Sequence, residues 1–220
     1  MMRATRQQFQ ATLRELERQT LGGLDLVIDQ LNRAIDAIAH QDADLAGMVI
    51  ADDDRIDGRY LEVHQGILSL LALQAPVAND LRLVAALLHI IRSVERMGDQ
   101  CVNIAKLVTL SGDNPPKDKD LLKLIERLGE LTRSQASQAK EAFATRRVAL
   151  ARDLVGEHVE IFRMNRQIFN RAVEIGNDFE TREWAMFMIL IARALERIAD
   201  NTVDVAEQTT FVVTGQFPES

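Results

Sequence analysis

Apolar side chains recur at steps of three and four residues along most of the chain. The first such stretch, from about residue 3 to residue 40, contains Phe9, Leu13, Leu16, Leu24, Val27, Ile28, Leu31, Ile35 and Ile38. This spacing places the apolar side chains on one face of an α-helix, whereas a half-buried strand would need strict alternation. The pattern therefore predicts a long amphipathic helix over this stretch.

Turn-forming residues divide the remaining periodic stretches into further helices. Asp42 is a suitable N-cap, Pro76 fits a first helical turn, and Gly, Asn and two prolines make 111–117 the strongest loop signal. A shorter turn is expected at 176–178. The predicted helices span about 3–40, 42–74, 77–110, 118–145, 147–175 and 180–213. Because short connections join long helices, neighbouring helices are expected to pack antiparallel.

The third and sixth predicted helices carry the same motif. Residues 91–107 read IRSVERMGDQCVNIAKL, and residues 192–208 read ARALERIADNTVDVAEQ. Three oxygen-bearing side chains at four-residue steps are Glu95, Asp99 and Asn103 in one copy and Glu196, Asp200 and Asp204 in the other. The offset is constant, since 196 − 95 and 200 − 99 are both 101. A repeat of this kind indicates an internal duplication.

The duplication decides the predicted architecture. We expect an all-α protein made of two tandem three-helix bundles, the first at 1–110 and the second at 118–220, joined by a linker at 111–117. The composition agrees with this fold class, because aromatic residues make up only 5% of the chain and there are only 11 Gly and 4 Pro. Strands would favour more aromatic and β-branched side chains.

Charge and cysteine content exclude several classes of function. A formal net charge of −7 argues against a nucleic-acid partner, because neutralising phosphates needs clustered Lys and Arg. The single cysteine, Cys101, excludes an intrachain disulfide and fits the cytoplasm. The longest apolar run, around 83–91, is too short to span a bilayer, and the N-terminal stretch lacks a signal-peptide core. Any membrane contact is therefore expected to be peripheral.

Each motif aligns its acids along one edge of the apolar helix face, since side chains four residues apart lie about one turn apart. Like charges at this spacing repel each other. Two kinds of compensation fit the sequence, namely ion pairs with the motif arginines or a bound metal cation. The arginines are Arg92, Arg96, Arg193 and Arg197. Aligned carboxylate oxygens suit hard cations such as iron, manganese, magnesium or zinc.

Further acids are candidates for a supporting role in these sites. They are Asp54 and Asp57 in the second predicted helix, Glu157 and Glu160 in the fifth, and Glu207 after the second motif. Glu207 corresponds to Lys106 in the first copy. Because Glu207 adds a negative charge where Lys106 adds a positive one, the second copy is predicted to bind a cation more tightly.

The usual enzymatic use of carboxylates in a helical bundle does not fit this sequence. A ferritin-like di-iron site needs Glu-x-x-His on two helices. The residues three positions before the four histidines are Ala37, Leu61, Ala86 and Val155. No nucleophile elbow or P-loop occurs either. We therefore expect a protein that is not an enzyme. The alternatives are a structural helical interaction module without metal and a carboxylate-bridged metalloenzyme.

The motifs together resemble the PhoU family, the phosphate-specific transport accessory proteins. The resemblance rests on both Glu-Arg-x-x-Asp motifs, on Asp-Asp-Arg-Ile-Asp at 53–57 and on Leu-Ala-Leu-Gln-Ala-Pro-Val-Ala-Asn-Asp-Leu-Arg at 71–82. It implies a duplicated, PhoU-like three-helix bundle with metal sites. The ligands that the resemblance implies are Glu95, Asp99, Asn103, Glu196, Asp200 and Asp204.

The resemblance also implies a function. PhoU family proteins are non-enzymatic cytoplasmic regulators, often homodimers, that link the phosphate ABC transporter to a membrane sensor histidine kinase. They negatively regulate phosphate uptake and phosphate-starvation signalling. The chain is accordingly expected to bind metal ions, to contain no transmembrane segment, to bind no nucleic acid, and to reach the inner face of the membrane only through its partners.

Overall fold

A computed structural model describes residues 2–74, 76–112, 115, 117–176 and 178–216. Parts of the predicted linker (113, 114 and 116), Asn177 of the predicted turn and Ala75 of the 71–82 segment lie outside the described residues. Within them the helices are α1 (Met2–His40), α2 (Ala43–Ala51), α3 (Asp53–Leu73), α4 (Ala78–Leu110), α5 (Lys119–Thr145), α6 (Val148–Glu174) and α7 (Phe179–Thr214). The prediction of an all-α protein is confirmed.

Aspartate caps begin three of the helices. Asp42 accepts a hydrogen bond from the backbone N–H of Leu45 at 2.8 Å, as predicted, and Asp118 does the same for Leu121 at 2.8 Å. Asp178 caps α7 in the same way. Each cap satisfies a backbone donor that has no partner within the helix and typically stabilises the protein by about 1 kcal/mol. The short connections therefore begin new helices at defined residues.

The second predicted helix is not continuous, and this part of the prediction is wrong. It is interrupted at Asp52, whose backbone has φ −84° and ψ 0° and whose carboxylate pairs with Arg33 of α1 at 2.6 Å. Apolar periodicity did not reveal the break because the buried Val49 and Ile56 keep a helical seven-residue spacing across it. The break gives α3 a new N-terminus that begins with Asp53 and Asp54.

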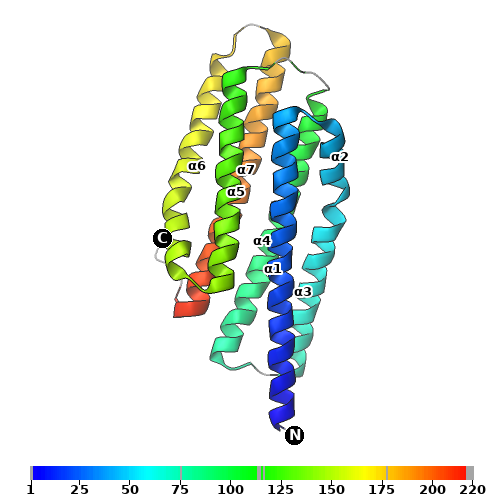
Figure 1. Ribbon diagram of the computed structural model, residues 1–220, viewed down its shortest axis with the longest axis vertical. Helices are drawn as coiled ribbons and strands as arrows, with labels where there is room; N and C mark the ends of the chain where they lie inside the picture. Colours follow the sequence, from blue (N-terminus) through cyan, green and yellow to red (C-terminus); the bar gives the residue numbers. More distant parts are fainter. Residues whose placement is uncertain (1, 75, 113–114, 116, 177, 217–220) are drawn as a thin grey trace.

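The long helices run side by side along the long axis of the molecule (Figure 1). α1 packs on α4 and α5 packs on α7, while α4 packs on α7 and α1 on α5. α2 and α3 flank α1 and α4, and α6 flanks α5 and α7 on the opposite side. Each half is therefore a three-helix unit, with α2 and α3 together acting as the second helix of the first half.

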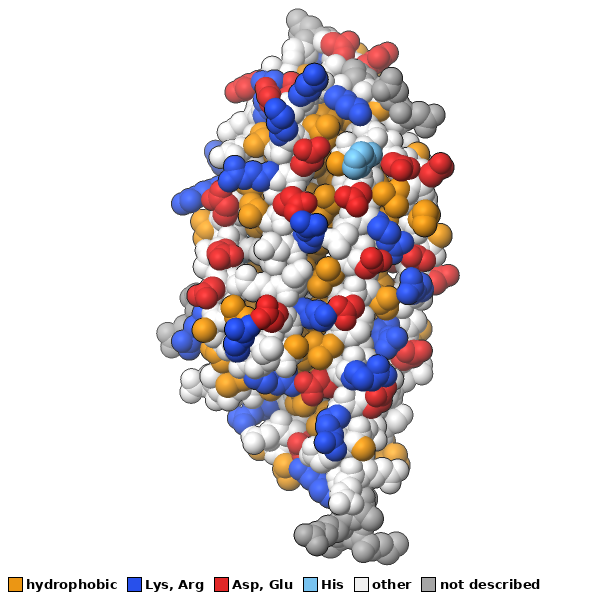
Figure 2. Space-filling model, viewed as in Figure 1, with side chains coloured by type: hydrophobic (Ala, Val, Ile, Leu, Met, Phe, Trp, Pro, Cys, Tyr) orange, Lys and Arg blue, Asp and Glu red, His pale blue; other side chains and the backbone are white. Residues whose placement is uncertain are grey.

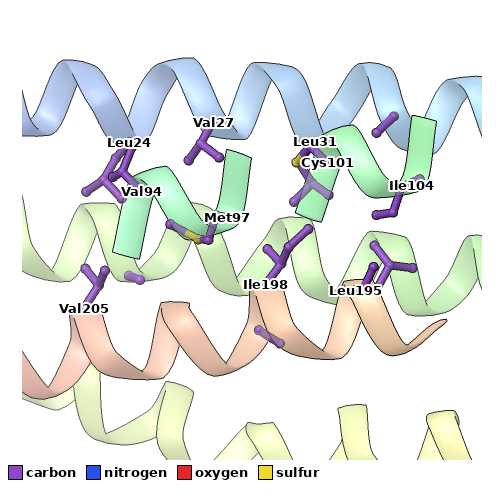
Figure 3. Packing of buried hydrophobic residues seen from close by; sticks show 14 of the residues in the cluster. Leu24, Val27, Leu31, Val94, Met97, Cys101, Ile104, Leu195, Ile198 and Val205 are labelled. Atoms are coloured by element: carbon purple, nitrogen blue, oxygen red, sulfur yellow. The ribbon is translucent and has the colours of Figure 1, made fainter. Parts of the chain in front are cut away.

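The two halves share one hydrophobic core. α4 and α7, which carry the duplicated motif, form the most extensive helix–helix contact in the described chain. Figure 3 shows side chains of α1, α4 and α7 pointing toward one another, among them Leu31, Met97 and Ile198. Cys101 lies in this core and is fully buried, and burial raises the pKa of its thiol. The inner faces of both motif helices are buried against each other, so the two three-helix units pack around a common core.

A glycine allows one of the contacts between the halves. Gly129 of α5 faces Ile35 of α1, and a Cβ at this position would lie 3.0 Å from the nearest Ile35 side-chain atom. Two ion pairs, Lys140 with Asp25 and Arg146 with Glu17, join the same two helices at the surface. On the face drawn in Figure 2, basic and acidic side chains are interspersed.

Candidate metal centre

The predicted ligands lie on two helices, Glu95, Asp99 and Asn103 on α4 and Glu196, Asp200 and Asp204 on α7. In both copies the Glu is the least exposed of the three. Glu95 is half-buried, and Glu196 is only 8% exposed. The side chains at the second and third positions are exposed in both copies. The structure thus confirms that the motif borders the core.

In the first copy, α3 adds two acids to the motif. Asp53 and Asp57, one helical turn apart, approach Glu95 and Asp99 closely enough for their charges to interact. None of these four carboxylates forms an ion pair with Lys, Arg or His in the described chain. We call this group, Asp53, Asp57, Glu95 and Asp99, the acidic cluster.

Two carboxyl groups of the acidic cluster, those of Glu95 and Asp53, have raised pKa values. Burial raises the pKa of Glu95, and the negative charges of Asp99 and Asp57 raise it further, against the opposing effect of Arg92 and Arg96. The pKa of Asp53 is raised for the same reasons, first by burial and then by Asp57 and Asp99. Gln30 and Lys106 partly oppose that rise. The nearby arginines therefore do not fully offset burial and like-charge repulsion at Glu95.

The donor set fits a hard cation, but the side chains are not gathered around one point. Within the described residues, no group of three or more His, Cys, Asp or Glu side chains is arranged so that it could hold a metal ion. Asp57 and Asp99 are exposed and sit on α3 and α4, one turn from Asp53 and Glu95. The residues that would hold a cation here are therefore carboxylates from two adjacent helices, and the ion would supply the missing positive charge.

The second copy is compensated by protein groups. Arg193 pairs with Glu196 at 2.6 Å, and the side-chain amide of Asn165 on α6 donates to the same carboxylate. His158, also on α6, lies 3.1 Å from Asp200. The ion-pair interpretation of the motif, left open by the sequence, is thus correct for Glu196.

The third position of the second motif faces α4. Burial raises the pKa of Asp204, and the positive charges of Arg96 and His89 on α4 oppose this rise. Glu207 also has a raised pKa, caused first by burial and then by Asp204. Asp204 therefore lies close enough to α4 for their charges to interact, and Glu207 lies near Asp204 on α7.

Of the supporting acids proposed from the sequence, one lies beside the first motif and the others do not join it. Asp57 joins the acidic cluster, but it is Asp53 and not Asp54 that accompanies it, and Asp54 is exposed. The signal for Asp53 was present, because Asp53 and Asp57 have the same four-residue spacing as the motif. On α6, Glu157 is exposed and Glu160 pairs with Arg163 at 3.5 Å. Asn165 and His158 had no comparable sequence signal.

The duplicated helices match a known domain twice. The sequence pattern of the PhoU domain matches residues 23–108 and again residues 125–209. The chain belongs to the PhoU family. One PhoU repeat thus comprises the C-terminal part of α1 together with α2, α3 and most of α4, and the other comprises most of α5 to α7. The family resemblance noted from the motifs is confirmed.

PhoU relatives match over nearly the whole chain. The phosphate-specific transport system accessory protein PhoU homolog of Clostridium acetobutylicum is 29% identical over 215 residues, which cover 96% of this chain and 97% of the relative. The homolog of Deinococcus radiodurans is 30% identical over 214 residues, covering 96% and 98%. The crystal structure of the phosphate transport system regulatory protein PhoU from Streptococcus pneumoniae superposes with a TM-score of 0.88. That structure is 25% identical and covers 96% of this chain and 100% of its own.

The PhoU fold of this chain contains no helix, among the described residues, that is long and apolar enough to cross a membrane.

Proposed function

We propose that this PhoU family protein is a non-enzymatic regulator of phosphate transport. In this proposal it is a metal-binding adaptor that links the phosphate ABC transporter to the sensor histidine kinase and negatively regulates phosphate uptake and phosphate-starvation signalling. The observation that carries the regulatory part is the match over 96% of the chain to relatives named as phosphate-specific transport accessory proteins. It acts in the cytoplasm and reaches the membrane through its partners.

The regulatory part is tested in a deletion strain. Without the protein, phosphate-responsive genes are expected to be transcribed in plentiful phosphate, because the negative signal is lost. Transcript levels measured in rich and poor phosphate decide the question. Continued repression in rich phosphate would exclude a negative regulatory role.

The metal part of the proposal rests on the acidic cluster. Four carboxylates from α3 and α4 interact without an ion-pair partner in the described chain, and hard cations such as iron, manganese, magnesium or zinc are bound by such oxygen donors. Elemental analysis of protein purified without chelator is expected to find metal. Glu95→Gln with Asp99→Asn removes the two motif charges from this cluster and is expected to abolish metal retention.

A matched control comes from the second copy of the motif. Glu196→Gln with Asp200→Asn makes the same chemical change where Arg193 and His158 already pair with the acids. This variant is expected to retain metal. If wild-type protein contains no metal under several metal-replete conditions, or if both double variants lose metal equally, the proposed cation site is wrong.

The adaptor part needs a surface for a protein partner, and α6 with α7 offers one. A groove of about 460 Å³ between these helices is lined by Phe162, Asn165, Arg166, Phe169, Asn170, Ile189, Leu190, Arg193 and Glu196. Phe162 is 61% exposed and Phe169 52% exposed. Exposed aromatic side chains rimmed by polar groups are typical of protein-binding surfaces.

The charge of the groove indicates the chemistry of the partner. Arg166 lines it and forms no ion pair in the described chain, whereas the carboxylate of Glu196 is already held by Arg193 and Asn165. We infer that the partner inserts an apolar helix face and places a carboxylate beside Arg166.

Binding to the purified cytoplasmic parts of the kinase and the transporter tests this surface. Phe162→Ala with Phe169→Ala is expected to weaken one of these complexes, while Leu68→Ala, an exposed apolar residue on α3, is expected to leave it unchanged. Equal binding by all three proteins would exclude the groove as the docking surface. Sedimentation of wild type and variant measures the expected homodimer and shows whether a second copy occupies the groove instead.

A further inference from the structure

A second groove lies between the two PhoU repeats and carries positive charge. It is formed by the C-terminal half of α4 and the N-terminal half of α7, and its volume is about 300 Å³. Its lining residues are Gln100, Asn103, Lys106, Leu107, Leu190, Arg193, Ala194 and Arg197. Among these described residues are three cations and two amides, but no carboxylate. Such a lining is unexpected in a chain with a net charge of −7.

Two of the three cations are not used by the fold. Arg193 pairs with Glu196 at 2.6 Å. Neither Lys106 nor Arg197 forms an ion pair in the described part of the chain, and both side chains are exposed. Lys106 acts only at longer range on Asp53 of the acidic cluster. Lys106 and Arg197 therefore line the groove without an ion-pair partner among the described residues.

The duplication supplies an internal comparison for this groove. The 101-residue offset relates Asn103 to Asp204, Lys106 to Glu207 and Arg197 to Arg96. At the related positions, the charge of Arg96 acts on Asp204, and Asp204 lies near Glu207. There, an arginine of α4 offsets part of the negative charge of Asp204 on α7.

In the groove, the two acids are replaced by an amide and a lysine. This departure from the repeat removes two negative charges and adds one positive charge beside Arg197. The sequence alone predicts Asn103 as a ligand of the first cation site and Lys106 as a positive charge that weakens cation binding there. In the structure, both side chains line the α4–α7 groove together with two arginines of the other repeat.

We propose that the α4–α7 groove binds a phosphate-type oxyanion. Arg and Lys supply charge-assisted hydrogen bonds to such an anion, and the amide groups of Gln100 and Asn103 can donate to its oxygens. Leu107 and Leu190 add an apolar wall, so a phosphoryl group with an organic part also fits this lining. The site needs both repeats, because neither α4 nor α7 alone supplies both Lys106 and Arg197. The proposal does not depend on the cation site.

Calorimetric titration of the full chain tests the proposal. Protein and buffers are first passed over a chelating resin, so that no cation and no soluble chelator contributes. Inorganic phosphate, pyrophosphate and phenyl phosphate are the probes. One saturable site per chain with a dissociation constant below about 1 mM is expected for at least one of them. Tighter binding of phenyl phosphate than of phosphate would identify a phosphorylated organic molecule as the ligand, and the reverse order would identify the free ion.

Variants taken from the repeat itself make the test specific. Asn103→Asp with Lys106→Glu gives the groove the acids of the second copy and is expected to weaken binding at least about tenfold, because attraction becomes repulsion. Lys123→Glu changes an exposed lysine of α5 outside the groove and is expected to leave binding unchanged. Asp204→Asn with Glu207→Lys is expected to create a second site of the same kind.

Two results would overturn the proposal. The first is the absence of saturable binding for all three anions. The second is an equal loss of affinity in the Lys123→Glu and Asn103→Asp, Lys106→Glu proteins, since this would show attraction by overall charge alone. Circular dichroism confirms that each variant is folded, which is expected because all substituted groove positions are exposed or half-buried.

Discussion

The two copies of the Glu-Arg-x-x-Asp motif share a sequence pattern but have opposite electrostatic environments. Glu95 and Asp99 meet two further acids of α3, and their charge is left without an ion pair in the described chain. Glu196 is held by Arg193 and Asn165, and Asp200 lies beside His158. The same two carboxylates therefore lie among further acids in one repeat and are paired with protein groups in the other.

The difference comes from the helix that packs beside each motif. α3 presents Asp53 and Asp57 to α4, whereas α6 presents Asn165 and His158 to α7. Counting charges along each motif helix predicts a tighter cation site in the second copy. We propose instead that the first copy binds a cation more tightly, because Asp53 and Asp57 of α3 add negative charge beside it and Coulomb attraction depends on all charges nearby, not only on those of one helix.

Cation addition is expected to produce the largest difference between the copies. At a manganese concentration about 100 times the dissociation constant, the free energy of unfolding rises by about 2.7 kcal/mol, because the cation binds only the folded state. The corresponding rise in melting temperature is roughly 5–10 °C for a chain of this size. Thermal melts of resin-treated protein, with and without metal, measure it.

The paired variants assign that rise to one copy. Glu95→Gln with Asp99→Asn is expected to remove it, and Glu196→Gln with Asp200→Asn to keep it. A metal-dependent rise in both variants would mean that the second copy also binds a cation despite its ion pairs.

Truncation at the second copy is expected to have a smaller but clear effect. Glu196→Ala leaves the Asn165 amide and the Arg193 guanidinium without their partner. Since Arg193 can still reach water, the expected loss in the free energy of unfolding is about 2 kcal/mol, below that of a fully buried pair. Urea denaturation of metal-free protein checks this. Glu95→Ala is the matched variant, and a similar loss there would contradict the comparison.

The pH dependence of the first copy should show the smallest effect. The pKa of Glu95 is raised, so the native state keeps its proton at pH values where the unfolded chain has lost it. The free energy of unfolding therefore falls as pH rises from the unfolded value of about 4.3 through the raised folded value.

The Glu95→Gln protein isolates this contribution. In metal-free protein it is expected to match wild type near pH 4 and to become more stable than wild type, by a few tenths of a kcal/mol or more, as the pH approaches 7. A difference in the free energy of unfolding that stays constant with pH would show that the acidic cluster does not raise the pKa of Glu95.

Most of the fold could be predicted from periodicity and caps, but the break at Asp52 could not. Asp42 begins a helix as expected, because a cap is a local hydrogen bond between neighbours in sequence. At the interruption, Asp52 pairs with Arg33, which is nineteen residues earlier, and the buried residues on either side keep a helical spacing that hides the break. Its consequence is large, since the new N-terminus of α3 carries Asp53 into the acidic cluster.

The sequence alone determined the helices, the duplication and the position of the motif at the edge of the core, because these follow from spacing within single helices and from a constant offset. Only the tertiary structure decided which charges meet. The residues that it brings together come from different helices: Asp57 and Glu95, Asn165 and Glu196, and Lys106 and Arg197. The physical reason is that electrostatic energy depends on distance in space, and packing two repeats around one core sets those distances independently of sequence order.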